Sequence, residues 1–235
     1  MENAQYNVLP EPIPAATLER AKKLSPAQLC DGMKGLGIER DGCMDADLMP
    51  VDGTKTMIGT ACTVDTANGD NLPIHVALYQ AKPGYVMVIA GKNHREKAYF
   101  GDLIGSTADA LGLSGMVVDG PLRDRMGLAA LNTPFYGRGY IQRGPDKKNP
   151  GGINVPVVCA GVRVNPGDLV VGDCDGVTVI PRDRISDVLE GAEKKADYEE
   201  KRRVVIAQYA RCRLENKPLP NLAPDWVKEA LEKLR

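Results

Sequence analysis

An arginine and an aspartate stand side by side directly after a short apolar segment, in the stretch GMVVDGPLRDRMG (residues 115–127). They are Arg123 and Asp124, and twenty residues separate Asp102 from Arg123. An arginine can hold a substrate carboxylate through two parallel hydrogen bonds, and Mg²⁺ is commonly bound by one or two carboxylates plus water. These three side chains could therefore bind an anionic substrate through a metal ion. A solvated Arg–Asp pair on a surface loop is the alternative, which spacing alone favours.

Other chemical motifs are absent from the sequence. It contains no G-x-x-x-x-G-K-[ST] phosphate loop, no strand-linked G-x-G-x-x-G and no G-x-S-x-G nucleophile elbow. Because there are only two histidines, a histidine-rich metal site is excluded. His75 lies in the apolar segment IHVAL and is expected to pack in the interior, and His94 is expected in a loop. The candidate chemistry therefore depends on carboxylates and arginines.

Charge and composition narrow the class of protein. Thirty basic residues are balanced by 31 acidic ones, so nucleic acid is not expected as a partner. No apolar run approaches the roughly 20 residues that span a bilayer, and the start MENAQYNVLPEPIP does not resemble a secretory signal. The six cysteines show no C-x-x-C spacing, which argues against structural zinc. We expect a cytoplasmic protein with reduced cysteines and no membrane association.

The elements that must position the candidate side chains alternate between helix and strand. Ser25 and Pro26 are typical of a helix start, and a Gly-, Asp- and Met-rich loop follows. The pattern then predicts strand at 56–67, helix at 71–81, strand at 85–91, helix at 96–112 and strand at 115–120. Ligand groups in open α/β sheets gather where strands end, which is where Arg123 and Asp124 fall. Valine-rich strands follow at 155–181, then a charged helix at 182–214 and a short helix from Asp225.

Several segments together resemble one known family. They are the D-x20-R-D pattern, GDNLPIHVAL (69–78), KPGYVMVIAG (82–91), FGDLIGSTADALGLSGMVVDGPLRD (100–124) and INVPVVCAGVRVNPGDLVVGDCDGVTVIP (153–181). The chain is similar, over roughly residues 25–200, to the 4-hydroxy-4-methyl-2-oxoglutarate aldolases. These are class II pyruvate aldolases, and they share a fold with the regulator of ribonuclease activity A. The combination of segments is specific, although no single segment is.

The resemblance implies a fold and an assembly. The expected fold class is α/β, a layered α/β/β sandwich resembling the phosphohistidine swivelling domain, with a C-terminal helical extension. On this basis we expect an N-terminal arm at 1–24, the catalytic domain at 25–182 and the helical extension at 183–235. The resemblance further implies a homo-oligomer, either a trimer or a hexamer, with the site at the subunit interface.

The resemblance also implies roles for individual residues. Asp124 would be the direct ligand of a divalent metal, Mg²⁺ or Mn²⁺, and Asp102 would hold a metal-bound water. Arg123 would bind the pyruvyl oxygens of the substrate and stabilise the developing enolate. The backbone at Gly101, Asp102 and Leu103, at a helix start, would offer N–H groups to the substrate carboxylate. A glutamate of a neighbouring subunit, Glu199 or Glu200, would lie near the metal-bound waters.

The activity implied by the resemblance is cleavage of a 4-hydroxy-2-oxo diacid to pyruvate and a second oxo acid. Suitable substrates are 4-hydroxy-4-methyl-2-oxoglutarate and 4-carboxy-4-hydroxy-2-oxoadipate, and oxaloacetate decarboxylation is the expected side activity. The alternative is a non-enzymatic regulator of ribonuclease activity. That regulator lacks the aspartate after the arginine, so Asp124 favours the enzyme. The segment RGPDKKNPGG (143–152) matches no family pattern, and the substrate stays open.

Overall fold

The computed structural model describes residues 4–234. These residues form two compact units, divided between Ala192 and Glu193. The larger unit contains every strand, and the smaller one contains most of a long helix and a short terminal helix. None of the helices within the described range is both long and apolar enough to cross a bilayer.

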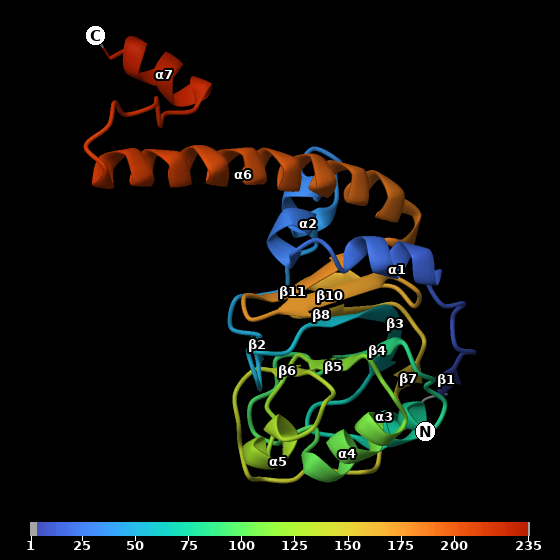
Figure 1. Cartoon of the computed structure of the whole chain (residues 1–235). Helices are drawn as coiled ribbons and strands as arrows, with labels where there is room; N and C mark the ends of the chain where they lie inside the picture. The colour runs from blue at the N-terminus through green and yellow to red at the C-terminus, as the bar shows by residue number, and fades with distance from the viewer. Residues whose placement is uncertain (1–3, 235) are drawn as a thin grey trace. The chain divides into compact units, whose positions relative to one another are not determined.

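Four parallel strands form the centre of the larger unit. Each of the first three is followed by a helix, and the three helices cover one face of the sheet (Figure 1). The strands, in spatial order, are β3 (Met57–Asp65), β4 (Tyr85–Ala90), β5 (Gly115–Val118) and β6 (Phe135–Gly137). The helices are α3 (Leu72–Leu78), α4 (Asp102–Ala110) and α5 (Arg125–Ala129). The predicted alternation of strand and helix is confirmed.

The other face of the sheet is covered by strands. β10 (Leu169–Asp173) pairs antiparallel with β3 and with β11 (Gly176–Ile180), and β8 (Val157–Cys159) pairs with β9 (Val162–Val164) in a separate sheet. The short strands β1 (Gln5–Tyr6), β2 (Met49–Pro50) and β7 (Gly152–Ile153) extend the main sheet. The mixed α/β class is therefore confirmed. The likeness to the phosphohistidine swivelling domain stays a prediction.

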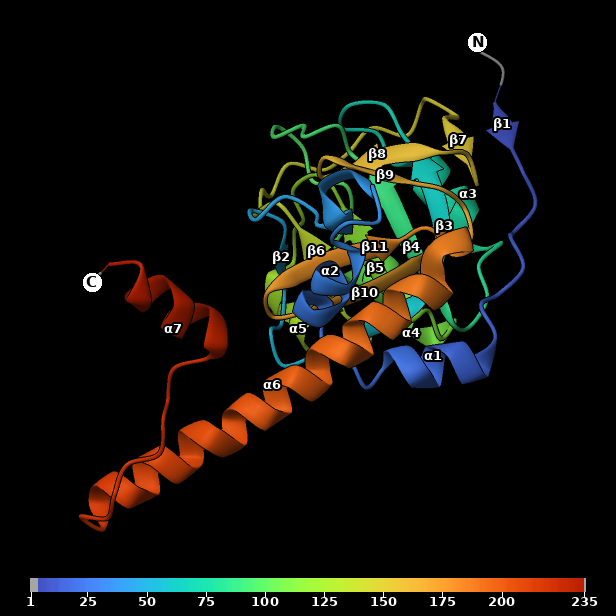
Figure 2. The same ribbon diagram turned by 90° about the horizontal axis from the view of Figure 1, so that it is seen from above.

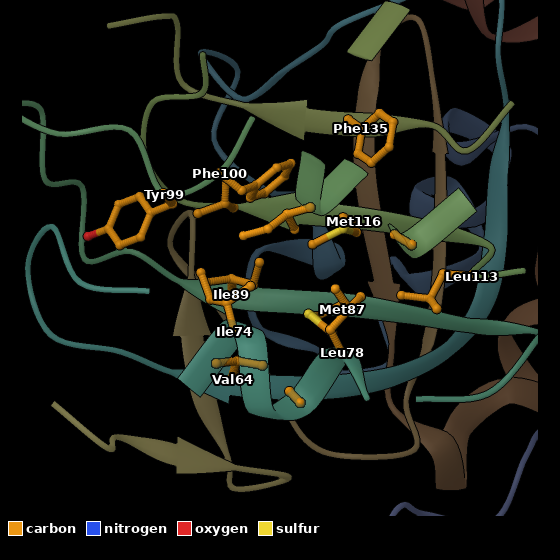
Figure 3. Packing of buried hydrophobic residues seen from close by; sticks show 14 of the residues in the cluster. Val64, Ile74, Leu78, Met87, Ile89, Tyr99, Phe100, Leu113, Met116 and Phe135 are labelled. Carbon is orange, nitrogen blue, oxygen red and sulfur yellow. The ribbon is translucent and has the colours of Figure 1, made fainter. Parts of the chain in front are cut away.

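Apolar side chains pack on both faces of the central strands. On the helix side, Met87 and Ile89 of β4 meet Ile74 and Leu78 of α3 (Figure 3). On the strand side, a second cluster joins the alternate residues of β4 and β5 to the valines of β8–β11. Because β4 is buried along its whole length, it reads in the sequence as an uninterrupted apolar run.

Two helices precede the sheet in the chain, α1 (Ala15–Ala21) and α2 (Pro26–Met33). The predicted helix start is confirmed by a reciprocal cap: Ser25 Oγ accepts a hydrogen bond from the Gln28 amide at 3.2 Å, and Gln28 Oε1 accepts one from the Ser25 amide at 3.0 Å. Seen from above, α2 lies over β10 and β11 (Figure 2).

The cysteine prediction is wrong for one pair. Cys30 of α2 and Cys43, which follows the 3-10 turn η1 (Glu39–Gly42), form a disulfide. The two residues are 13 positions apart, so no short cysteine motif indicates the pairing. The four other cysteines in the described part of the chain are free: Cys62, Cys159, Cys174 and Cys212.

The last part of the chain is helical, as predicted. A 3-10 turn, η2 (Arg182–Arg184), leads into α6 (Ile185–Leu214), which is 30 residues long. Its first turns belong to the larger unit and bury Ile185, Val188 and Leu189. The rest of α6 is rich in charge and belongs to the smaller unit, together with α7 (Asp225–Glu232).

Candidate functional site

The helix predicted at 96–112 begins later than the sequence indicates, at Asp102. The preceding residues, 96–101, form an irregular segment that is hydrogen-bonded to the segment that follows β5. The Tyr99 amide donates to the carbonyl oxygen of Pro121 at 2.9 Å, and the Arg123 amide donates to that of Phe100 at 3.1 Å. This pairing places the start of α4 next to the start of α5.

Asp124 lies against the backbone of Gly101, the residue that caps α4. A Cβ atom at Gly101 would overlap Asp124 Oδ2 and would lie 2.8 Å from Arg123 Cγ, closer than carbon atoms pack. The Asp124 carboxylate can therefore occupy this position only because residue 101 is glycine and has no Cβ atom. Arg123 and Asp124 are thus positioned by the first turn of a helix that precedes them by twenty residues.

Asp102 is placed in a matching way. A Cβ atom at Gly127 of α5 would lie 2.7 Å from Asp102 Cβ and 3.2 Å from Asp102 Oδ2. The Asp102 side chain therefore packs against α5, just as the Asp124 side chain packs against the start of α4. The structure brings together Asp102, Arg123 and Asp124, as the sequence predicts, and their chemical roles stay predictions.

Arg123 and Asp124 form an ion pair. Arg123 Nε lies 3.2 Å from Asp124 Oδ2, and each side chain is 40% exposed. A pair this exposed stabilises a fold by only about 0–1 kcal/mol. The backbone of Asp124 is nevertheless left-handed, with φ 54°, a conformation that residues other than glycine adopt uncommonly. This backbone directs the carboxylate to Gly101, which favours a built site over a plain surface pair.

The first turn of α4 has donors to offer. Gly101 caps the helix without a side-chain hydrogen bond, and its carbonyl oxygen accepts from the Gly105 amide at 3.0 Å. The amides of the first turn of a helix have no acceptor within that helix, and their N–H groups form the positive end of the helix dipole. A carboxylate at this position would receive these hydrogen bonds. The predicted use of residues 101–103 in binding a substrate carboxylate stays a prediction.

Glu199 and Glu200 lie on α6, in the smaller unit. Arg203 Nη2 is 3.1 Å from Glu199 Oε2, and Arg203 Nη1 is 3.4 Å from Glu200 Oε2. The predicted role of these glutamates is exercised at the site of a neighbouring subunit. It stays a prediction.

Sequence reasoning missed a buried charge cluster centred on Arg138, which follows β6. The Arg138 side chain is only 6% exposed, and its Nε lies 2.7 Å from Asp119 Oδ1. It also pairs with Asp45, and with Asp47 Oδ1 at 2.5 Å. Burial raises the pKa of Asp119, whereas the hydrogen bond from Arg138 lowers the pKa of Asp45. Asp119 directly follows the buried strand β5, and an acidic residue at this position was the sequence signal that could have indicated a buried charge.

The Arg138 cluster fixes the loops at the edge of the sheet where the candidate site lies. Arg95, in the loop after β4, donates to Asp47 Oδ2 at 2.8 Å and to the Arg138 carbonyl oxygen at 3.3 Å. The cluster therefore connects segments that follow β4, β5 and β6. It contributes to positioning and not to the set of residues predicted to meet substrate.

Neither histidine belongs to the one group of potential metal ligands found in the described residues. His75 lies on α3, where burial and then the charge of Lys147 lower its pKa. Within residues 4–234, one group of three potential metal ligands has its donor atoms within 4.8 Å of one another, Asp173, Cys174 and Asp175. This group lies in the exposed turn between β10 and β11, away from the start of α4 in the chain.

Comparison with known proteins is decisive for the family. The Aldolase/RraA model of RraA-like proteins matches residues 26–179. The chain belongs to the RraA-like family. This RraA-like chain is 43% identical over 163 residues to a Halalkalibacterium halodurans protein named "Putative 4-hydroxy-4-methyl-2-oxoglutarate aldolase", covering 69% of this chain and 78% of that protein. The resemblance stated from the sequence is confirmed.

Among the similar solved structures, one is described by a second function, inhibition of a ribonuclease. The RraA-like chain matches Streptomyces coelicolor RraAS2, described as an unusual member of the RNase ES inhibitor RraA protein family, with a TM-score of 0.72 and 25% identity. The match covers 81% of this chain and 98% of that one. An uncharacterized Pseudomonas syringae protein matches with a TM-score of 0.73 and 25% identity, over 84% of this chain and 95% of the other. Both functional classes weighed from the sequence are therefore represented among the relatives.

Proposed function

We propose that this RraA-like protein is a divalent-metal-dependent lyase that cleaves a 4-hydroxy-2-oxo diacid to pyruvate and a second oxo acid. The observation that carries the proposal is the packing of the Asp124 carboxylate on Gly101, beside Arg123 and close to the first turn of α4. Candidate substrates are 4-hydroxy-4-methyl-2-oxoglutarate and 4-carboxy-4-hydroxy-2-oxoadipate. The H. halodurans relative named for cleavage of the first of these compounds is 43% identical to this chain.

The residues present fit a hard divalent cation. Asp124 provides a half-exposed carboxylate, and Asp102 provides a second carboxylate at the start of the adjoining helix. Mg²⁺ and Mn²⁺ prefer oxygen ligands and retain water in the remaining positions, so two carboxylates suffice. Asp124 would hold the ion and Asp102 one of its waters. When bound, the metal would polarise the 2-oxo group and stabilise negative charge as the carbon–carbon bond breaks.

The chain's own residues perform the remaining tasks. The amides of the first turn of α4 receive the 1-carboxylate of the substrate, and the Arg123 guanidinium binds the pyruvyl oxygens. The Asp102 carboxylate, acting through a water, would take the proton of the 4-hydroxyl group. The C3–C4 bond then breaks: its electrons pass to the pyruvyl fragment as an enolate, and C4 becomes the carbonyl of the second oxo acid. Protonation of the enolate at C3 gives pyruvate.

Oxaloacetate gives the same enolate on loss of carbon dioxide, so we propose decarboxylation as a side activity. We further propose that the working form is a trimer or hexamer in which Glu199 or Glu200 of a neighbouring subunit approaches the site. A second candidate function is regulation of a ribonuclease, because the S. coelicolor relative is described as a member of an RNase inhibitor family. Asp124 favours the lyase, since a binding protein has no need of a metal ligand there.

The test is oxaloacetate decarboxylation, with pyruvate release coupled to a dehydrogenase. Activity should vanish with EDTA and return with Mg²⁺ or Mn²⁺, which requires no assumption about the physiological substrate. Asp124→Ala should abolish the metal-dependent turnover and leave the fold intact, because the side chain is half exposed. Absence of turnover with every metal would overturn the lyase proposal. A co-purification with a ribonuclease would then be the next experiment.

A further inference from the structure

A buried aspartate outside the predicted site organises the loop that reaches Arg123. Asp70 is 1% exposed and lies just before α3. Its Oδ2 accepts hydrogen bonds from the amides of Lys148 at 2.8 Å and Asn149 at 3.2 Å, and its Oδ1 accepts from the Leu72 amide at 2.9 Å. A buried carboxylate with several backbone donors is a strong anchor for a loop.

The same loop is fastened at two more points. The Asp146 amide donates to the Gly69 carbonyl oxygen at 2.8 Å, and Lys97 Nζ lies 2.5 Å from Asp146 Oδ2. The Arg143 carbonyl oxygen accepts from the Ala98 amide at 2.9 Å. Residues 143–149 are therefore held between the segment before α3 and the irregular segment before α4. No family motif predicted a task for this loop, and its hydrogen bonds now assign one.

The beginning of the loop lies against the guanidinium group of Arg123. A Cβ atom at Gly144 would lie 3.2 Å from Arg123 Nη1, and no other atom would lie within 4 Å of it apart from its chain neighbours. Gly144 thus borders the end of the Arg123 side chain that is predicted to bind substrate oxygens. Arg123 Nε is itself buried and donates no hydrogen bond, so the ion pair with Asp124 and the packing around the side chain hold it in place.

We infer that Asp70 is a positioning residue: it holds loop 143–149 so that Gly144 confines the Arg123 guanidinium to its substrate-binding position. This inference rests on the proposed function. An amide at position 70 would turn either its NH₂ group toward the backbone donors or its single oxygen toward only part of them. The loop would then open for a fraction of the time, and Arg123 would be correctly placed only in the remaining fraction.

The effect follows from that fraction. If Asp70→Asn leaves the loop closed for about a tenth of the time, the apparent affinity falls about tenfold. We expect the KM for oxaloacetate to rise about tenfold, and kcat to change less than about threefold, because the bound complex is assembled as before. Gly144→Ala, which crowds Arg123 without touching the anchor, should raise KM in the same way. Gly53→Ala is the matched control, since its Cβ would lie at an ordinary 3.5 Å from Cys174 Cβ.

Two measurements need no turnover and keep this inference separate from the lyase proposal. Hydrogen–deuterium exchange should be faster at residues 146–149 in Asp70→Asn and unchanged there in Gly144→Ala. Modification of Arg123 by phenylglyoxal, read by mass spectrometry, should be faster in Asp70→Asn than in the wild type. Unchanged exchange or unchanged Arg123 reactivity overturns the inference even in an active enzyme. A wild type without turnover overturns the lyase proposal alone.

Discussion

Gly101→Ala tests most directly whether the candidate site is built by close packing. The added Cβ would overlap Asp124 Oδ2 and would stand 3.1 Å from Arg123 Nε as well as 2.8 Å from Arg123 Cγ. The Gly101 backbone has φ −140°, an extended value that alanine adopts freely, so backbone strain does not contribute. The entire effect of the substitution therefore falls on the two side chains predicted to bind metal and substrate.

The magnitude follows from the overlap. To reach ordinary contact with the new methyl group, the Asp124 carboxylate has to move by about 1 Å, and a displacement of this size can cost about 100-fold in rate. That corresponds to about 2.7 kcal/mol of transition-state stabilisation. We expect kcat/KM for metal-dependent oxaloacetate decarboxylation to fall about 100-fold. Crowding of a half-exposed pair should lower the free energy of unfolding by about 1 kcal/mol, at the low end for overpacking.

The assay compares wild type, Gly101→Ala and the control Gly53→Ala at saturating Mg²⁺, with thermal unfolding measured on the same samples. Gly53→Ala should keep both activity and stability, because its methyl group meets only ordinary contacts. If Gly101→Ala retains activity within about threefold of the wild type, the packing of Asp124 on the start of α4 does not shape the site. An equal loss in both variants would point to a general effect of the added methyl group.

Two further perturbations probe the charges. Arg123→Lys should lower kcat/KM by about 100-fold, because an ammonium group cannot reproduce the paired hydrogen bonds of the guanidinium; near-normal kinetics would remove Arg123 from the mechanism. Asp45→Asn should destabilise the fold by about 1 kcal/mol near neutral pH, since the hydrogen bond from Arg138 holds the folded-state pKa of Asp45 below 3.8. The stabilising contribution is present above pH 3.8 and is lost as the pH falls through the lower, folded-state pKa, so urea denaturation of the two proteins should converge in acid. A constant difference down to about pH 2 would contradict this assignment.

Local patterns were enough to predict the alternating core. The strand at 85–91 and the helix at 71–81 carry their own signals, an apolar run bounded by turns and a helical period. The proximity of Asp102 to Arg123 and Asp124 was also predictable, since an α/β sheet collects such residues at one edge. The start of α4 at Asp102 was not predictable in this way. Residues 96–101 have helical character, but their hydrogen bonds go to the segment after β5 and to Arg143, and this tertiary pairing overrides the local preference.

The Arg138 cluster and the anchor at Asp70 could not have been predicted from spacing. Asp45 lies in a loop far from Arg138 in the chain, and Asp70 receives its donors from Lys148 and Asn149 across more than seventy residues. Such contacts depend on the folded arrangement of loops, which no local period encodes. The Cys30–Cys43 disulfide was also not predicted, because the composition and spacing of the cysteines indicated only reduced thiols.

Each of the two short helices at the site accommodates a carboxylate that belongs to the other: Asp124 rests on Gly101, and Asp102 rests on Gly127. The two glycines are therefore as restrictive as the acids. In a family member with a side chain at the position of Gly101, a carboxylate in this place would have to be displaced, whatever residue follows its arginine. Under the proposed lyase function, we expect the two glycine positions to separate lyases from binding proteins among RraA-like chains, independently of the acidic residues themselves.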